Sequence, residues 1–269
     1  MKQILLLLST VFLCSFVQAQ ETAKSCSGEI KAVRETFYYN CKKKGANYIP
    51  LQKGNENEYF YDENGRMVKA ISYLSPGQPF RYSQYEYDNH GQMTKNLLLD
   101  EMSDTLINCR CTYTYDSLNR PTTESCSCGG NIELTEHFYT HYTDSIVCET
   151  FEDKKLKYRT VNDTMGRVLR SYSHHDGINF SMVQYSIYYP NDGLPTIEKN
   201  EACNDVYSYV YNEFGDLSSS WEWRNGVWTN SMQYSYEYDK HNNWITRILI
   251  DKGRKKETAT IVKREITYW

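Results

Sequence analysis

After its first 17 residues, the 269-residue sequence has no apolar run approaching the ~20 residues that a membrane-spanning helix needs. It has no stretch rich in Gly, Ser or Pro that is typical of a linker, which predicts a single domain. It also lacks an excess of basic residues, since 30 Lys and Arg stand against 34 Asp and Glu, for a formal net charge of −4. This balance disfavours nucleic acid or an anionic membrane as the main partner.

Motifs of common enzyme chemistry are missing as well. The sequence has no Gly-x-Ser-x-Gly elbow, no Gly-rich phosphate loop and no His-Glu-x-x-His. We therefore expect a protein that is not an enzyme and holds no cofactor. A glycoside hydrolase is the alternative, because it needs only two carboxylates, and a sequence does not place these in space.

The first 19 residues are typical of an export signal. Lys2 supplies the positive start, residues 4–17 form the apolar segment, and Val17 and Ala19 are small residues before a cleavage site. Cys14 follows Leu13, which is larger than the residue usual before a lipoprotein cysteine, so we expect no lipid anchor. The mature chain, 20–269, then has 29 basic and 34 acidic residues, a charge of −5, and is expected in the periplasm, at the cell surface or secreted.

Tyrosine is abundant, with 25 Tyr beside 5 Trp, and both residue types favour half-buried strand positions. The segment Glu58-Tyr-Phe-Tyr-Asp-Glu-Asn-Gly-Arg66 recurs as Gln84-Tyr-Glu-Tyr-Asp-Asn-His-Gly-Gln92 and as Thr112-Tyr-Thr-Tyr-Asp-Ser-Leu-Asn-Arg120. Further copies begin at Val161, Ile187, Tyr209 and Tyr236, and residues 139–142 form a degenerate one. About eight units of 20–28 residues cover residues 58–250, as in a repeat array.

Each unit has the pattern of a β-hairpin. In Tyr-x-Tyr both rings point to one face of a strand. The Asp that follows can accept hydrogen bonds from backbone N–H groups two and three residues on, which starts a turn. The Gly or Asn three positions later tolerates the positive φ of a three-residue loop with a G1 bulge. The predicted turn residues are Asp62, Gly65, Asp88, Gly91, Asp116, Asn119, Gly166, Gly193, Gly215 and Asp239.

The Tyr-Asp-x-x-Gly-Arg pattern resembles the RHS/YD repeat over roughly residues 58–250. The resemblance implies an extracellular or exported β-sheet protein, and such repeats have been linked to carbohydrate binding. Long RHS arrays coil into shells around a toxic cargo, but this chain has about eight units and no evident toxin domain after them. We therefore expect an all-β fold of tandem antiparallel hairpins that forms one curved sheet or a partly closed barrel.

The two ends of the array have strand patterns of their own. Residues 28–39 are predicted to be a first strand, although Ile30, Val33, Phe37 and Cys41 would also suit one face of a helix. Residues 260–269 are predicted to be a closing strand. Its terminal aromatic residues are also a feature of outer-membrane strands, but residues 261–266 would carry charges on both faces, which lipid disfavours.

Eight cysteines remain after removal of Cys14, an even number that predicts disulfides in an exported chain. Two Cys-x-Cys pairs flank the third turn, and a matching register would place Cys109 opposite Cys128 and Cys111 opposite Cys126, at non-hydrogen-bonded positions. A one-residue bulge would break this match. The alternative is a zinc or copper site formed by the same four residues. The other expected pairs are Cys26–Cys41 and Cys148–Cys203.

No metal site is predicted elsewhere. His137 and His141 are four residues apart, which suits a metal on a helix but leaves them ~13 Å apart on a strand, so we expect exposed strand histidines. His174-His175-Asp176 is predicted to be a loop. The acidic turn at Asp62 lacks the further ligands of a calcium loop.

Tryptophans supply the candidate binding site. Trp221-Glu-Trp223 places two indoles on one strand face, and Trp228 follows a predicted turn. Exposed and coplanar, they would stack on sugar rings or a peptide, but core positions are the favoured alternative for such large side chains. The expected partner is an extracellular or periplasmic glycan. A protein partner, as for an immunity-type scaffold bound through a sheet face or edge, is the other expectation.

Overall fold

The computed structural model describes residues 29–45, 47–75, 77–100, 107–128, 130–165, 167–174, 180–188, 195–200, 205–224, 226–252 and 257–269. The predicted signal sequence, residues 1–19, lies outside these ranges. The described residues contain no helix that is long and apolar enough to cross a membrane.

All regular structure in the described residues is β-strand, which confirms the predicted fold class. The strands are β1 Ile30–Tyr39, β2 Lys42–Lys44, β3 Asn47–Ile49, β4 Gln52–Tyr61, β5 Met67–Ser75, β6 Gln78–Tyr87, β7 Met93–Asp100, β8 Ile107–Tyr115, β9 Pro121–Cys128, β10 Asn131–His141, β11 Ser145–Glu152, β12 Lys155–Asp163, β13 Val168–His174, β14 Phe180–Tyr188, β15 Pro195–Asn200, β16 Asp205–Tyr211, β17 Leu217–Arg224, β18 Val227–Tyr238, β19 Trp244–Asp251 and β20 Thr258–Tyr268.

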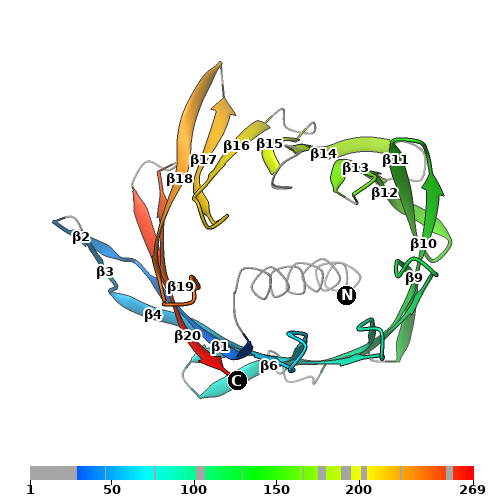
Figure 1. Cartoon of the computed structure of the whole chain (residues 1–269), viewed down its shortest axis with the longest axis horizontal. Coiled ribbons are helices and arrows are strands. Elements are labelled where there is room, and N and C mark those ends of the chain that lie inside the picture. Colours follow the sequence, from blue (N-terminus) through cyan, green and yellow to red (C-terminus); the bar gives the residue numbers. More distant parts are fainter. Residues whose placement is uncertain are drawn as a thin grey trace.

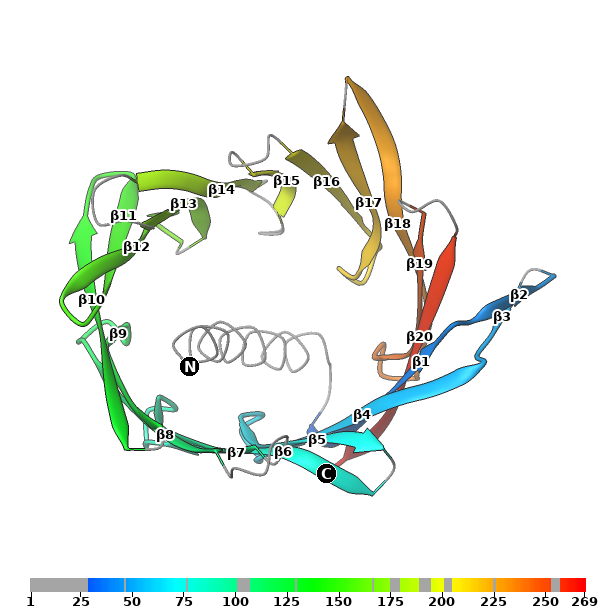
Figure 2. The same ribbon diagram turned by 180° about the vertical axis from the view of Figure 1, so that it is seen from behind.

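Eighteen of these strands form one antiparallel sheet, and β2 and β3 form a separate hairpin. From β4 to β20 each strand pairs with the next one in the chain. Strand β1 pairs with β20 on one side and with β4 on the other, so the succession of neighbours returns to its starting strand. The sheet therefore curves into a ring (Figures 1 and 2).

The two rims of the ring differ in their connections. The motif turns join β4 to β5, β6 to β7 and so on to β18 and β19, so they share one rim with the start of β1 and the end of β20. Several of them curl toward the middle of the ring (Figure 1). The opposite rim carries the connections between β17 and β18, between β19 and β20, and the β2–β3 hairpin between β1 and β4.

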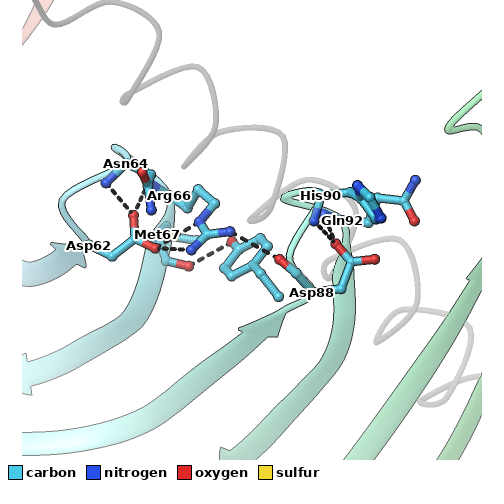
Figure 3. Close-up of polar contacts among 8 residues, drawn as sticks. Asp62, Asn64, Arg66, Met67, Asp88, His90 and Gln92 are labelled. Carbon is cyan, nitrogen blue, oxygen red and sulfur yellow. Dashed lines mark hydrogen bonds and ion pairs between the residues drawn. The ribbon is translucent and has the colours of Figure 1, made fainter.

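The motif turns follow from the chemistry of the Asp. The Asp62 Oδ1 accepts hydrogen bonds from the backbone N–H groups of Asn64 (3.0 Å) and Arg66 (2.9 Å), as Figure 3 shows. The same pattern recurs at Asp88, Asp116, Asp163, Asn212 and Asp239. The side-chain oxygen therefore accepts hydrogen bonds from the N–H groups of the second and fourth residues after it. The prediction of the second residue was correct, and that of the third was wrong. The fourth residue lies opposite the Asp across the turn, where the Asp62 N–H donates to the Arg66 carbonyl at 2.9 Å, and this brings the Arg66 N–H close to the Asp62 carboxylate.

The predicted positive φ angles are found at most of these turns. They are +74° at Gly65, +82° at Gly91, +63° at Asn119 and +83° at Gly215. The predicted turn residues Gly166 and Gly193 lie outside the described residues. Gly65 donates its N–H to the Asp62 carbonyl at 2.9 Å, which closes the loop as the G1-type turn requires.

Tyrosine hydroxyls join four neighbouring pairs of hairpins in the described residues. The Tyr87 hydroxyl donates to the Met67 carbonyl at 2.7 Å, at the first residue of the preceding unit's returning strand. Equivalent bonds run from Tyr115 to Met93, from Tyr139 to Pro121 and from Tyr236 to Leu217. Turn arginines lie over the same rings, with Arg66 5.1 Å from the centroid of Tyr87. Because the turns curl inward and cover these rings, the tyrosine face is the inner face of the ring.

The first and last strands meet at the seam of the ring. Both predicted terminal strands form, and β1 is a strand rather than a helix. Glu35 of β1 pairs in register with Arg264 of β20, and the Arg264 Nε lies 2.8 Å from the Glu35 Oε1. The guanidinium of Arg264 also lies 3.3 Å from the ring centroid of the buried Trp244. Beside the seam, Ile30, Val33, Tyr61, Met67 and Tyr85 form a buried apolar cluster.

Candidate ligand-binding site on the β17–β18 hairpin

Strands β17 and β18 form a hairpin that projects from the ring (Figure 1). Arg224 pairs with Val227 across a connection of two residues, and the sequence there is Asn225-Gly226, a favoured dipeptide for such loops. Gly226 has a φ of +80°, which glycine adopts without strain. The local sequence therefore favours a short connection, and Trp223 and Trp228 lie on the two strands beside it, in the part of the hairpin that projects from the ring.

The three tryptophans are exposed, so the favoured core placement was wrong. The exposed fractions are 37% for Trp221, 38% for Trp223 and 40% for Trp228. The residues that alternate with them, Ser220 and Glu222, are buried at 7% and 9%. The reason is the direction of the pleat: the inner face of the hairpin receives Ser220 and Glu222, and the outer face receives the indoles.

This arrangement inverts the usual burial pattern of a strand. Strands normally bury their large apolar side chains and expose their polar ones. Here the hairpin leaves 37–40% of the surface of three tryptophans exposed, at a cost in hydrophobic free energy. Exposed aromatic surface gathered at one place is typical of a binding site.

The indoles are close to one another but not coplanar. Trp223 and Trp228 occupy opposite positions of the two strands, with ring centroids 5.4 Å apart and planes tilted by 59°. The Trp221 Nε1 donates to the Ser219 hydroxyl at 3.3 Å, which fixes the orientation of that ring. The predicted coplanar platform is therefore replaced by two inclined faces with a third indole beside them.

Both predicted disulfides of the third hairpin form, with Cα–Cα distances of 4.2 Å for Cys109–Cys128 and 4.0 Å for Cys111–Cys126. These short distances are those of non-hydrogen-bonded pairs. The Glu124 carboxylate lies with the Cys111 and Cys126 sulfurs in a group within 4.8 Å. The two sulfurs form a disulfide and are therefore not thiolate ligands. The alternative of a zinc or copper site at the four cysteines is not supported.

A bulge produces this cysteine register rather than breaking it. Close to the turn Tyr115 pairs with Pro121, but Thr114 pairs with Thr123, so the returning strand contains one extra residue, Thr122. Without it, Cys109 would face Ser127. The expectation that a bulge would destroy the match was wrong, because the bulge lies between the turn and the cysteines. The same shift occurs at Val68, Thr94, Leu169, Thr196, Ser218 and Ile245.

The other four cysteines form no disulfide among the described residues. Cys41 and Cys148 have no disulfide partner among the described residues. Their predicted partners, Cys26 and Cys203, lie outside those residues, so the two pairings stay predictions. In the reduced state, burial raises the pKa of the Cys148 thiol, which favours its protonated form.

A group of carboxyls on the inner face bears on the glycosidase alternative. Glu124 and Glu152 flank Thr135 on either side, which puts them two strand spacings, ~10 Å, apart. Burial raises the pKa of Glu124 and also that of Glu152. An acid and a base in one glycosidase site need pKa values pushed in opposite directions. The shared direction here does not suit that division of roles.

The histidines of β10 form no joint site. His137 is half-buried and its Nδ1 lies 3.1 Å from the Thr150 hydroxyl, so the expectation that it is exposed was wrong. Burial lowers the pKa of His137. His141 is exposed and contacts Arg120 of the neighbouring turn. His175 and Asp176 lie outside the described residues.

Sequence reasoning missed the role of the arginine that ends the motif. The Arg66 Nε lies 2.7 Å from the Asp62 Oδ2, and Arg120 and Arg167 bond Asp116 and Asp163 in the same way. The recurrence of Asp-x-x-x-Arg in three copies was a signal that could have found it. The arginine closes the turn and covers the tyrosine of the next unit.

Comparisons with known proteins identify no family: no family model matches the chain, and no curated protein matches it. Among solved structures, the chain is similar to a porin-like protein from Bacteroides uniformis, with 11% identity and a TM-score of 0.43 over 88% of this chain and 98% of that one. A porin-like protein from Bacteroides vulgatus gives 10% identity and a TM-score of 0.36 over 90% and 99% of the two chains. A TcdB2-TccC3-Cdc42 structure gives 12% and 0.29 over 72% of this chain but 15% of that one. With TM-scores below 0.5, none of these likenesses carries a functional argument.

Proposed function

We propose that this chain is a non-enzymatic, exported protein of the RHS/YD-repeat type that binds a carbohydrate at the cell envelope. The observation that carries the proposal is the exposure of Trp221, Trp223 and Trp228 above the buried Ser220 and Glu222. Indole faces stack on the apolar faces of sugar rings, and two inclined rings suit a curved glycan better than a flat ring system. The disulfides are compatible with an oxidising compartment.

The other expected roles have less support. Binding of a protein through an edge of the ring itself is disfavoured, because within the described residues every strand of the 18-stranded sheet has a neighbour on each side, and edges stay open only where hairpins project, as at Val227–Asn230 of β18. The pair Glu124 and Glu152 gives a glycoside hydrolase no support, because burial raises the pKa of both carboxyls.

The test is tryptophan fluorescence of the oxidised chain 20–269, titrated with a panel of neutral and acidic polysaccharides. We expect a saturable change that is lost when Trp221 and Trp223 are replaced by Ala, with an unchanged circular dichroism spectrum. Trp269→Ala is the matched control, because it removes an indole that is 51% exposed at a distant place. Binding that persists in the double variant, or no binding to any polysaccharide, would refute the proposal.

A further inference from the structure

A strongly basic hairpin lies on the same rim as the tryptophans. Strand β2 consists of Lys42, Lys43 and Lys44, all exposed, and its described pairing is with β3. The β2–β3 hairpin projects from the ring on the same arc as β17–β18 (Figures 1 and 2). Three adjacent ammonium groups in a chain of net charge −4 form a local field opposite in sign to that of the whole.

The topology places the two hairpins near each other. Going round the ring from β18, the next strands are β19, β20 and β1, which leads into β2. Three strand spacings, ~14 Å, separate β18, which carries Trp228, from β1, and Trp221 and Trp223 lie one spacing further away on β17. An oligosaccharide of several residues can span such a distance, whereas a monosaccharide cannot.

Hydrogen bonds and an ion pair link both hairpins to the segment between β19 and β20. The exposed Lys252 donates its backbone N–H to the Ser231 carbonyl of β18 at 2.8 Å, at the base of the tryptophan hairpin. On the other side, the Lys43 Nζ lies 3.8 Å from the Glu257 carboxylate, to which the Tyr48 hydroxyl also donates. Glu257 thus holds the basic hairpin against the start of β20.

The contact between Lys43 and Glu257 neutralises only part of the positive charge of the basic hairpin. Glu257 offers one negative charge to the hairpin, against the four ammonium groups of Lys42, Lys43, Lys44 and Lys252. The three lysines of β2 are exposed to solvent, where each pairs only weakly with an anion. Several together, acting on one polymeric anion, give an appreciable and salt-sensitive attraction.

We propose that the glycan is polyanionic: the indoles of the β17–β18 hairpin stack on its sugar rings while the lysines of β2 and Lys252 pair with its carboxylate or sulfate groups. This inference rests on the proposed function and specifies its ligand class. It assigns the aromatic hairpin to recognition of sugar and the basic hairpin to recognition of charge.

The experiment compares polygalacturonate with its fully methyl-esterified form, which has the same backbone without the charge, and adds chondroitin sulfate with unsulfated chondroitin. Affinities are measured by fluorescence and calorimetry on the oxidised chain 20–269. We expect each more highly charged polymer to bind about tenfold more tightly than its partner at low salt, and this preference to fade between ~50 and ~500 mM salt.

Two variants separate the contributions. Replacing Lys42, Lys43 and Lys44 by Gln should remove the preference for the charged polymers and leave binding of the methyl ester unchanged. Replacing Lys154, Lys155 and Lys157 by Gln is the matched control, because these lysines lie near the β11–β12 connection on the far arc of the ring. The control variant should retain the preference.

Three outcomes would overturn the inference, and they differ from a failure of the proposed function. Equal binding of the charged and less charged polymers would refute the charge preference while leaving carbohydrate binding intact. So would a preference that survives in the β2 variant. Tight binding of duplex DNA that depends on the β2 lysines but not on Trp221 and Trp223 would indicate a general polyanion surface instead. Only the absence of binding to every polysaccharide would refute the proposed function as well.

Discussion

The ion pair at the seam of the ring allows a sharp test of what holds the ring together. Glu35 and Arg264 join the first and last strands, and their side chains are 8% and 3% exposed. Replacing Glu35 by Ala removes the carboxylate but leaves the guanidinium buried over Trp244. Loss of one partner from a buried pair costs about 3–5 kcal/mol.

The expected result is a large loss of stability with partial recovery in a second variant. For a chain of this size, a loss of that magnitude lowers the thermal midpoint by on the order of 10 °C. Replacing Glu35 by Leu and Arg264 by Met together removes both charges, so we expect the double variant to be more stable than Glu35→Ala. Urea and thermal unfolding, followed by tyrosine and tryptophan circular dichroism, measure both effects.

An exposed ion pair provides the control. Arg159 and Glu149 pair across β11 and β12 with side chains 37% and 30% exposed, and Glu149→Ala should cost no more than about 1 kcal/mol. If Glu35→Ala costs no more than this control, or if the double variant is no better than the single one, the buried pair does not stabilise the seam.

Three further variants test features of the repeat. Replacing Cys111 and Cys126 by Ser opens a loop with a sequence separation of 15, but the outer disulfide still restrains the same hairpin. The loss measured by urea unfolding should therefore be below the ~3 kcal/mol expected for an isolated loop, and a larger loss would contradict this. Tyr87→Phe removes the bond to the Met67 carbonyl and should lower the unfolding free energy by about 0.5–1.5 kcal/mol, whereas no change would show that the hydroxyl does not link the units. Burial raises the pKa of Glu124, so the folded chain binds this proton more tightly than the unfolded chain. The resulting contribution to the free energy of unfolding is fully present at low pH and is lost as the pH rises through the pKa of the folded state. Glu124→Gln should flatten the fall in unfolding midpoint above about pH 4.5, and an unchanged pH profile would be the contrary result.

The parts of the fold that sequence could predict are those fixed by local chemistry. An Asp that caps its own turn and a Gly with positive φ act within five residues, so the turns at Asp62, Asp88 and Asp116 could be read directly. The alternation of Tyr-x-Tyr likewise predicted one tyrosine face. The extra residue one position into the returning strand, as at Val68 and Thr122, was not predicted, because it depends on the twist of the paired strands rather than on a residue type.

The non-local parts of the structure could not be read in the same way. The pairing of Glu35 with Arg264 joins residues 229 positions apart, and neither segment contains a sequence signal that would identify the other as its partner. The exposure of Trp221 and Trp223 was missed for a related reason. Alternation shows that both indoles share a face, but only the direction of the ring's curvature decides which face is buried.

The position of β1 between β4 and β20 has a consequence for the order in which this protein assembles. Of the strands of the sheet, β1 is synthesised first and can pair with β4 soon afterwards, yet its other neighbour, β20, is synthesised after all the others. A chain that ends before residue 258 would present the open edges of β1 and β19. Open edges promote pairing with other chains. The ring therefore closes only after β20 has been synthesised, since only then is β1 paired on both sides.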